Sequence, residues 1–177
     1  MAVATRSQTH RVLFGAVAIG WLALDQISKS WAESNLADKT IDVVWTLRLN
    51  LTFNKGASFS LGDGFGPLIA VIALAVVAAI LWHSRTVTSR LGAVALGMIV
   101  GGALGNVLDR LFRGSGGFFG GGVVDFIDFQ WWPVFNIADI GVVCGAILLV
   151  ISMLLPAGGE TGGAGSATTG STTGSTN

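Results

Sequence analysis

The sequence contains little charge and little cysteine. Charged residues make up only 11% of its 177 positions, against roughly 25% in ordinary soluble domains, while hydrophobic residues make up 51%. With a mean hydropathy of +0.70, the chain has too few polar side chains to cover a core in water. The single cysteine, Cys144, excludes a disulfide framework and a cysteine-based zinc site. Ten basic and ten acidic residues cancel, so no net charge attracts nucleic acid, and the composition predicts a membrane protein.

Four apolar segments have about the 20-residue length that crosses a bilayer core. They run from Val12 to Trp31, from Gly64 to Trp82, from Leu91 to Leu108 and from Phe135 to Leu155. Because only short or polar stretches separate them, we expect one domain over residues 1–156 that forms a membrane bundle of four helices. The first segment could instead be a cleaved signal peptide, since Arg11 precedes an apolar core. The helical pattern continues past Asp25 and Lys29, which argues against that alternative.

Basic residues in the short flanks predict the orientation of the bundle. Arg6 and Arg11 precede the first segment, and Arg85 and Arg90 lie between the second and the third. Since cytoplasmic flanks carry an excess of Lys and Arg, both termini are expected in the cytoplasm. The tail, residues 157–177, is rich in Gly, Ser and Thr. It has nothing to bury and is expected to be disordered.

Two segments outside the spans carry strand signals. Thr46 to Asn54 alternates strictly between apolar and polar side chains, which is typical of a strand with one apolar face. Val123 to Phe129 forms a second strand-like run after a glycine-dense stretch, residues 114–122. We therefore expect a small β-sheet on the outer surface of the membrane. An ordinary hairpin that closes the loop would explain the same pattern.

Four aspartates lie within or beside the predicted spans, although a charge at the bilayer centre costs roughly 2.5–3.5 kcal/mol. They are Asp25, Asp109, Asp125 and Asp139. With a rise of about 1.5 Å per residue and the orientation above, all four reach the outer interface. Each has a structural explanation of its own: Asp139 with Asn136, for example, could simply cap the last helix. Their common depth indicates one site.

Helical spacing adds partners to these aspartates. Asp25 and Lys29 are four residues apart and can form an ion pair. Asn106 and Arg110 have the same spacing and flank Asp109, which could pair with Arg110 to fix the helix register. Glycines at every fourth position of the third segment predict a close helix–helix contact; they are Gly97, Gly101 and Gly105.

The residue inventory limits the chemistry of this site. His10 and His83 lie at the cytoplasmic ends of their spans, so no histidine can act there as a base or a metal ligand. The HExxH motif of one intramembrane zinc protease type is missing, and we expect neither a metal nor a cofactor. A nucleophilic Ser58 or Ser60 would need a lysine as its base. An aspartate pair fits the inventory, because one carboxylate can take a proton from water while its protonated neighbour hydrogen-bonds the scissile carbonyl.

Five short blocks stand out along the chain. They are DQISK (25–29), NKGASF (54–59), GNVLDR (105–110), VVDF (123–126) and FNIAD (135–139). In this order, across residues 12–155, the blocks resemble those of the bacterial lipoprotein signal peptidases (signal peptidase II). The resemblance implies an aspartic endopeptidase of the bacterial inner membrane, built from four transmembrane helices and an outer sheet. It further implies removal of signal peptides from prolipoproteins just before a cysteine that carries diacylglycerol.

The resemblance also assigns roles to residues. It makes Asp125 and Asp139 the catalytic pair, near the outer leaflet. The residues that would bind substrate or support the pair are Asp25, Lys29, Asn54, Gly56, Asn106, Asp109, Arg110 and Asn136. The implied partners are lipid-modified prolipoproteins and membrane lipid, and the implied inhibitor is the cyclic peptide globomycin.

A non-enzymatic membrane protein, such as a transporter or an ion-relay subunit, is the alternative function. A relay needs ionisable groups through the full depth of the bundle. The second segment and the inner half of the third contain none, and the fourth has only Asp139 near its start. This distribution favours a site on one side of the membrane over a conduit through it.

Overall fold

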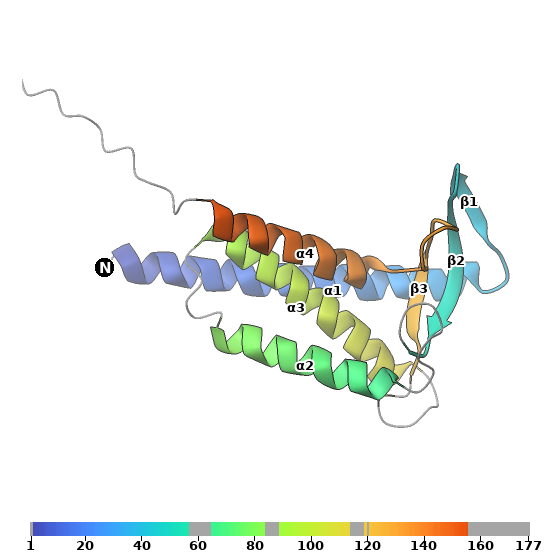
Figure 1. The fold of residues 1–177 in the computed structure, drawn as a ribbon, viewed down its shortest axis with the longest axis horizontal. Helices are drawn as coiled ribbons and strands as arrows, with labels where there is room; N and C mark the ends of the chain where they lie inside the picture. Colours follow the sequence, from blue (N-terminus) through green and yellow to red (C-terminus); the bar gives the residue numbers. More distant parts are fainter. Residues whose placement is uncertain (1, 57–64, 84–88, 114–118, 120, 156–177) are drawn as a thin grey trace, which may run out of the picture.

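The computed structural model describes residues 2–56, 65–83, 89–113, 119 and 121–155. Its elements are α1 (Ala2–Leu36), β1 (Ile41–Val44), β2 (Leu47–Asn54), α2 (Gly66–His83), α3 (Arg90–Phe112), β3 (Val123–Asp128) and α4 (Ile137–Leu154). The helices run side by side, and the sheet lies at the end of the bundle opposite the N-terminus (Figure 1). All four helices are long and apolar enough to cross a membrane, so the predicted four-helix bundle with a small sheet is confirmed. Some features discussed above lie outside the described residues: Ser58, Ser60, Arg85, most of 114–122 and the tail 157–177.

α1 extends beyond both ends of the segment predicted for it, residues 12–31. Its last turn buries Ala32 and Leu36 in a small core that also contains Val124 and Phe126 of β3. Polar residues interrupt the apolar pattern there, because only one face of the helix meets the sheet. The apolar pattern that predicted the first span therefore ends before the last turns of α1, which pack against the sheet.

The sheet has three antiparallel strands in the order β1-β2-β3. It includes β1, which the sequence pattern did not indicate because three of its four side chains are exposed and no alternation results. Thr52 lies opposite Asp125 in the pairing of β2 with β3, and Asn54 lies opposite Val123. This register brings the end of β2 to the Asp125 carboxylate. The two strands predicted from the sequence therefore belong to a three-stranded sheet and do not form the ordinary hairpin given as the alternative.

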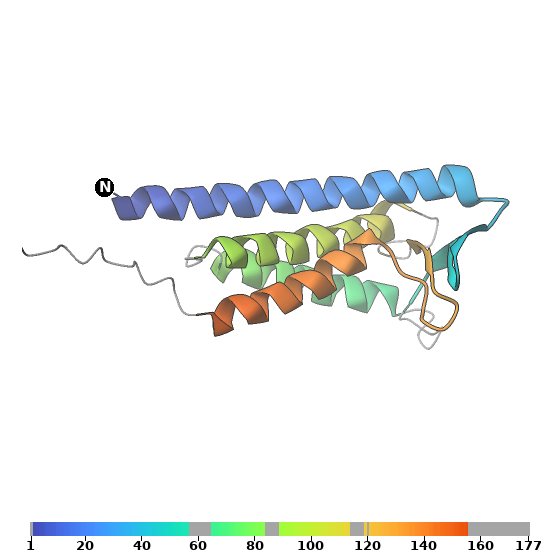
Figure 2. The ribbon, with the colours of Figure 1, turned by 90° about the horizontal axis from the view of Figure 1, so that it is seen from above.

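α3 is the central helix of the bundle. It lies between α1 on one side and α2 and α4 on the other (Figure 2), and most of its residues are buried. The predicted glycine contact is made with α1, since a Cβ atom at Gly97 would lie 2.8 Å from the carbonyl oxygen of Phe14. At Gly101 a Cβ atom would lie 2.5 Å from the carbonyl oxygen of Ala18 in α1, whereas Gly102 faces the backbone of Ala138 in α4. α1 and α4 therefore both approach α3 at glycines.

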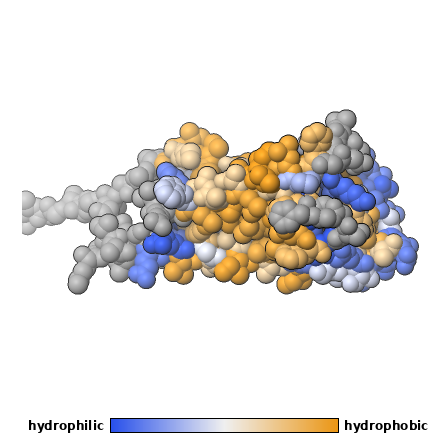
Figure 3. Space-filling model, turned by 90° about the horizontal axis from the view of Figure 1, so that it is seen from below, coloured by the Kyte–Doolittle hydropathy of each residue, from blue (hydrophilic) through white to orange (hydrophobic). Residues whose placement is uncertain are grey.

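The outer surface of the helices is apolar. Large hydrophobic side chains such as Ile19, Val71, Val143 and Ile147 are more than half exposed. Orange, hydrophobic side chains cover the middle of the molecule, and blue, hydrophilic ones gather at its two ends (Figure 3). Lipid-facing helices between two aqueous interfaces have this distribution. The chain is therefore a multi-pass membrane protein.

Candidate active site

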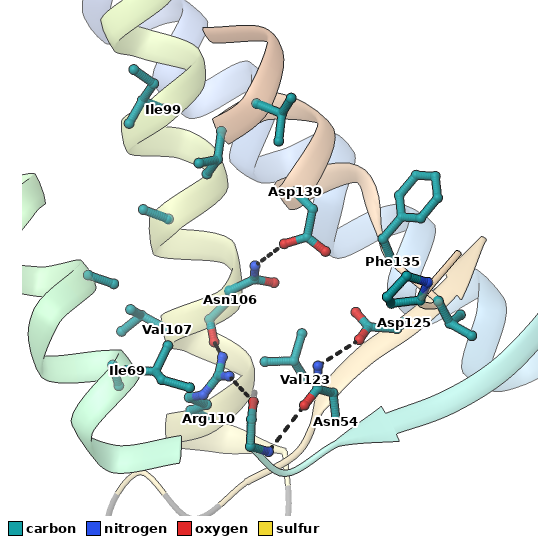
Figure 4. Close-up of a pocket in the computed structure, with 18 of the residues that line it drawn as sticks. Asn54, Ile69, Ile99, Asn106, Val107, Arg110, Val123, Asp125, Phe135 and Asp139 are labelled. Atoms are coloured by element: carbon teal, nitrogen blue, oxygen red, sulfur yellow. Dashed lines mark hydrogen bonds between the residues drawn. The ribbon is translucent and has the colours of Figure 1, made fainter. Parts of the chain in front are cut away.

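A cavity of about 610 Å³ opens at the sheet end of the bundle, between α2, α3, α4 and the strands β2 and β3. Asp125 and Asp139 both line it and both point into the space between them (Figure 4). The α2 side of the cavity is formed by apolar side chains, among them Ile69 and Ala73. The cavity therefore presents two carboxylates on one side and an apolar wall on the other.

Asp125 lies on β3 and is only 2% exposed. Its Oδ1 accepts a hydrogen bond of 2.6 Å from Asn136 Nδ2, and its Oδ2 accepts one of 3.2 Å from Asn54 Nδ2. Burial, and then the negative charge of Asp139, raise the pKa of Asp125 from its ordinary value to about 7. A carboxyl group in this environment holds its proton at a pH where an exposed aspartate has lost it.

Asp139 lies in the first turn of α4, where the chain forms a capping box. Asn136 is the N-cap: its side chain accepts from the Asp139 amide at 3.0 Å, and Asp139 Oδ2 accepts from the Asn136 amide at 3.2 Å. The expected cap is thus present, and it belongs to the site as well, because Asn136 also donates to Asp125. One asparagine therefore contacts both carboxylates. Asp139 Oδ1 accepts a further hydrogen bond of 2.9 Å from Asn106 Nδ2.

A buried cation, Lys29, lies behind the two carboxylates. The side chains of Lys29, Asp25 and Asp109 are 0% exposed. The Lys29 ammonium is 2.9 Å from Asp25 Oδ2 and 2.8 Å from Asp109 Oδ2, so the expected Asp25–Lys29 pair is present and has a second acid. The ammonium also donates to Asn106 Oδ1 at 2.9 Å.

Arg110 is not the partner of Asp109 that sequence spacing suggested. Asp109 pairs with Lys29 and with Arg113 Nε, the latter at 2.9 Å. The Arg110 side chain lines the cavity. It donates hydrogen bonds of 3.4 Å each to the carbonyl oxygens of Asn106 and Gly56. Among the described residues none forms an ion pair with it, and its Nε has no hydrogen-bond partner. Neighbouring positions on a helix point about 100° apart, so Asp109 and Arg110 face different surroundings.

The structure divides the predicted site residues into two groups. Those that line the cavity are Asn54, Gly56, Asn106, Arg110, Asp125 and Asp139. Asp25, Lys29, Asp109 and Asn136 are not among the lining residues. In the described part of the chain, no group of three or more His, Cys, Asp or Glu side chains is arranged to hold a metal ion.

Two residues of the charged cluster were missed at the level of sequence. Gln26 donates to the carboxylates of Asp25 and Asp109, at 3.1 Å each. Arg113 binds Asp109 and also forms an ion pair with Glu33. The spacing of four residues between Asp109 and Arg113 could have indicated that pair. Nothing in the sequence pattern indicates the Glu33 contact, because it joins α1 to the end of α3.

These features define a class of protein. A multi-pass helix bundle with two adjacent carboxylates facing one cavity has the arrangement of a membrane hydrolase of the aspartic type. Comparison with known proteins narrows the class to one family: the model of the signal peptidase (SPase) II family matches residues 17–155. The chain belongs to this family and is a membrane peptidase that removes signal peptides. The resemblance seen in the sequence is confirmed, and a non-enzymatic transporter is not favoured.

Relatives in several bacteria support the assignment. Lipoprotein signal peptidase of Rhodococcus jostii (strain RHA1) is 42% identical over 153 residues, which cover 83% of this chain and 76% of that protein. The lipoprotein signal peptidase of Mycobacterium avium (strain 104) is 45% identical over 138 residues, 77% of this chain and 75% of the relative. A solved bacterial membrane enzyme shares the fold with a TM-score of 0.67 and 27% identity, covering 78% of this chain and 85% of its own.

Proposed function

We propose that this protein cleaves lipid-modified prolipoproteins with a water molecule activated between Asp125 and Asp139. The observation that carries the proposal is their shared geometry: both carboxylates line one cavity and both accept hydrogen bonds from Asn136. Two carboxylates this close do not both ionise readily, so the pair holds one proton and titrates as a unit. One charged and one neutral carboxylate are what direct hydrolysis of a peptide bond requires.

The two aspartates take different roles in this mechanism. Asp125, with its pKa raised to about 7, carries the proton and donates a hydrogen bond to the scissile carbonyl. Asp139 accepts from Asn106 and from the Asn136 amide, donors that stabilise a charged carboxylate, and it takes the proton of the attacking water. When the tetrahedral intermediate collapses, that proton passes to the leaving amine, so the enzyme ends in its initial state.

The surroundings of the pair support an apolar, lipid-bearing substrate. The cavity wall from α2 and α4 includes Ile69, Ala73, Val76 and Val142, and apolar side chains of this kind accept acyl chains or the hydrophobic core of a signal peptide. The substrate class is a prolipoprotein whose cysteine carries diacylglycerol, cut just before that cysteine. We propose that globomycin inhibits the enzyme by binding in the same cavity.

The proposed location is the bacterial inner membrane, with both termini in the cytoplasm. Arg11 belongs to the N-terminal part of α1, and Arg90 is the first residue of α3. Both of these helix ends lie at the end of the bundle opposite the sheet (Figure 1). Basic flanks of short loops stay on the cytoplasmic side. This orientation places the sheet and the carboxylates near the outer leaflet, in contact with membrane lipid.

Cleavage of matched precursors tests the proposal. The purified full chain is incubated with a synthetic precursor whose cysteine carries diacylglycerol, and with the same peptide lacking the lipid. We expect one cut before the lipidated cysteine and a kcat/KM that falls as the pH rises through about 7, because Asp125 loses its proton there. Equal cleavage of the unmodified peptide would refute the substrate class. A rate that still increases above about pH 8 would refute the role of Asp125.

A further inference from the structure

The buried cluster of Asp25, Lys29 and Asp109 contacts the backbone directly ahead of each catalytic aspartate. Asp25 Oδ1 accepts a hydrogen bond of 2.9 Å from the amide of Ala138, the residue before Asp139. On the other side, Asp109 Oδ2 accepts one of 3.2 Å from the amide of Val124, the residue before Asp125. Both amides are buried. The two acids thus hold the start of α4 and the strand β3 from behind.

Lys29 joins these two acids. Its ammonium has three protons and three acceptors: Asp25 Oδ2, Asp109 Oδ2 and Asn106 Oδ1. An ammonium only donates, so each of its protons is used inside the protein and none is available to a substrate. Because the two acids are anchored to the backbone segments that carry the catalytic pair, the ammonium between them sets how far apart those segments lie.

The same ammonium fixes which way the Asn106 amide points. A donor-only group must face the oxygen of an amide, and Asn136 Nδ2 donates to the same Asn106 oxygen at 3.1 Å. The Asn106 nitrogen is therefore directed to Asp139 Oδ1, at 2.9 Å. The reversed amide would oppose its nitrogen to Lys29 and its oxygen to the carboxylate, both repulsive contacts.

We propose that Lys29, held between Asp25 and Asp109, is a positioning residue that sets the spacing and the charge state of the catalytic pair, acting on Asp139 through the Asn106 amide. The proposal rests on the proposed function, since it takes Asp125 and Asp139 as the reacting carboxylates. A role of Lys29 in substrate binding is disfavoured, because neither it nor its two acids line the cavity.

Other charged groups near the pair must be considered in a pH experiment. Arg110 of α3 lies close enough to interact electrostatically with Asp125, Asp139 and Asp109. At the far end of β2 and β3, Arg48 pairs with Asp128 at 2.7 Å. The exposed Lys55 follows β2. All of them stay in place in the variants below.

Three variants test the proposal: Lys29→Met, Asn106→Leu and the double variant. Loss of Lys29 releases the Asn106 amide from the orientation that directs its nitrogen to Asp139, and loss of the Asn106 amide removes that donor altogether. Both changes favour the protonated carboxyl, so the acidic limb of the pH profile of kcat/KM should move up by about one pH unit. We also expect kcat to fall roughly 10- to 100-fold while KM changes by less than about threefold.

The double variant distinguishes the connection through Asn106 from two separate effects. If Lys29 acts through Asn106, the limb of the double variant moves no further than that of Asn106→Leu; independent roles would give additive shifts and overturn the proposal. The exposed Ser34 of α1 supplies the control, Ser34→Ala, with an unchanged profile. An acidic limb that stays at its wild-type position in Asn106→Leu would also overturn it. That variant keeps the ion pairs of Lys29, so it gives an answer even if Lys29→Met does not fold.

The proposal and the proposed function can fail separately. A shift of the limb is measured only on enzyme that still cleaves, and a fraction of unfolded enzyme lowers kcat without moving the limb. If Asp125→Asn and Asp139→Asn are inactive but the limb of Asn106→Leu is unmoved, only the positioning role is wrong. If either aspartate variant retains activity, the catalytic pair itself is wrong.

Discussion

Replacement of Asp139 by asparagine, or of Asp125 by asparagine, is expected to lower kcat/KM by about 10³-fold or more. Asparagine has the shape of aspartate but can neither take a proton from water nor carry the proton of the pair. Each position keeps one of its two accepted hydrogen bonds, because the amide oxygen can still accept from Asn136 at position 125 or from Asn106 at position 139. Insertion and folding should therefore persist, and the loss should appear in kcat rather than in the yield of protein.

A third aspartate on the same elements supplies the control. Asp128 lies on β3 like Asp125, but it pairs with Arg48 and does not line the cavity. Asp128→Asn should retain kcat/KM within about threefold, because the Arg48 side chain is 37% exposed and stays solvated when the pair is lost. Initial rates on a lipid-modified precursor measure kcat/KM for the catalytic variants and for this control. Thermal unfolding in detergent checks that each variant is folded. Near-normal processing by either catalytic variant would contradict the assignment of the pair.

A valine at Gly101 is expected to prevent the bundle from closing. A Cβ atom there would lie 2.5 Å from the carbonyl oxygen of Ala18 and 2.9 Å from Trp21 Cβ. Because α1 backbone cannot move aside as a flexible side chain can, we expect Gly101→Val to cost about 3 kcal/mol or more. That is a large share of the stability of a typical domain.

The matched control for this substitution is Gly20→Val. Gly20 lies on α1 with nothing within 4 Å of the position of its Cβ, so the same side chain meets open space and should leave the fold intact. The yield of folded protein and the midpoint of thermal unfolding in detergent compare the two variants. A Gly101→Val protein with the wild-type midpoint would show that α1 and α3 are not packed as described.

Long apolar runs made the helices predictable, because the length of a bilayer span and the scarcity of charge are both visible in sequence. The last turn of α1 was not, since Ala32 and Leu36 meet the sheet on one helix face among polar neighbours. Strand β1 was missed for a related reason: its side chains are mostly exposed and carry no alternation. Such elements exist because of the tertiary contacts of their neighbours.

The site was predictable where it depends on spacing within one helix, as for the pair of Asp25 with Lys29. Spacing failed for Asp109, whose partners are Lys29 of α1 and Arg113 rather than Arg110. The four-residue spacing from Asp109 to Arg113 is visible in the sequence, but the contact with Lys29 depends on which face of α3 meets α1, and no pattern along a single helix contains that information. The catalytic roles themselves came from the resemblance of the sequence blocks to a known family, since two aspartates 14 positions apart in the chain carry no local signature of their own.

The most direct measurement of the central claim is a single turnover in water enriched in ¹⁸O. If water, activated between Asp125 and Asp139, attacks the scissile carbonyl itself, the new carboxylate of the released signal peptide should contain ¹⁸O after the first turnover. No acyl-enzyme should be seen by mass spectrometry of the intact protein. An unlabelled product with ¹⁸O in Asp125 or Asp139, or a covalent adduct on any residue, would contradict the account.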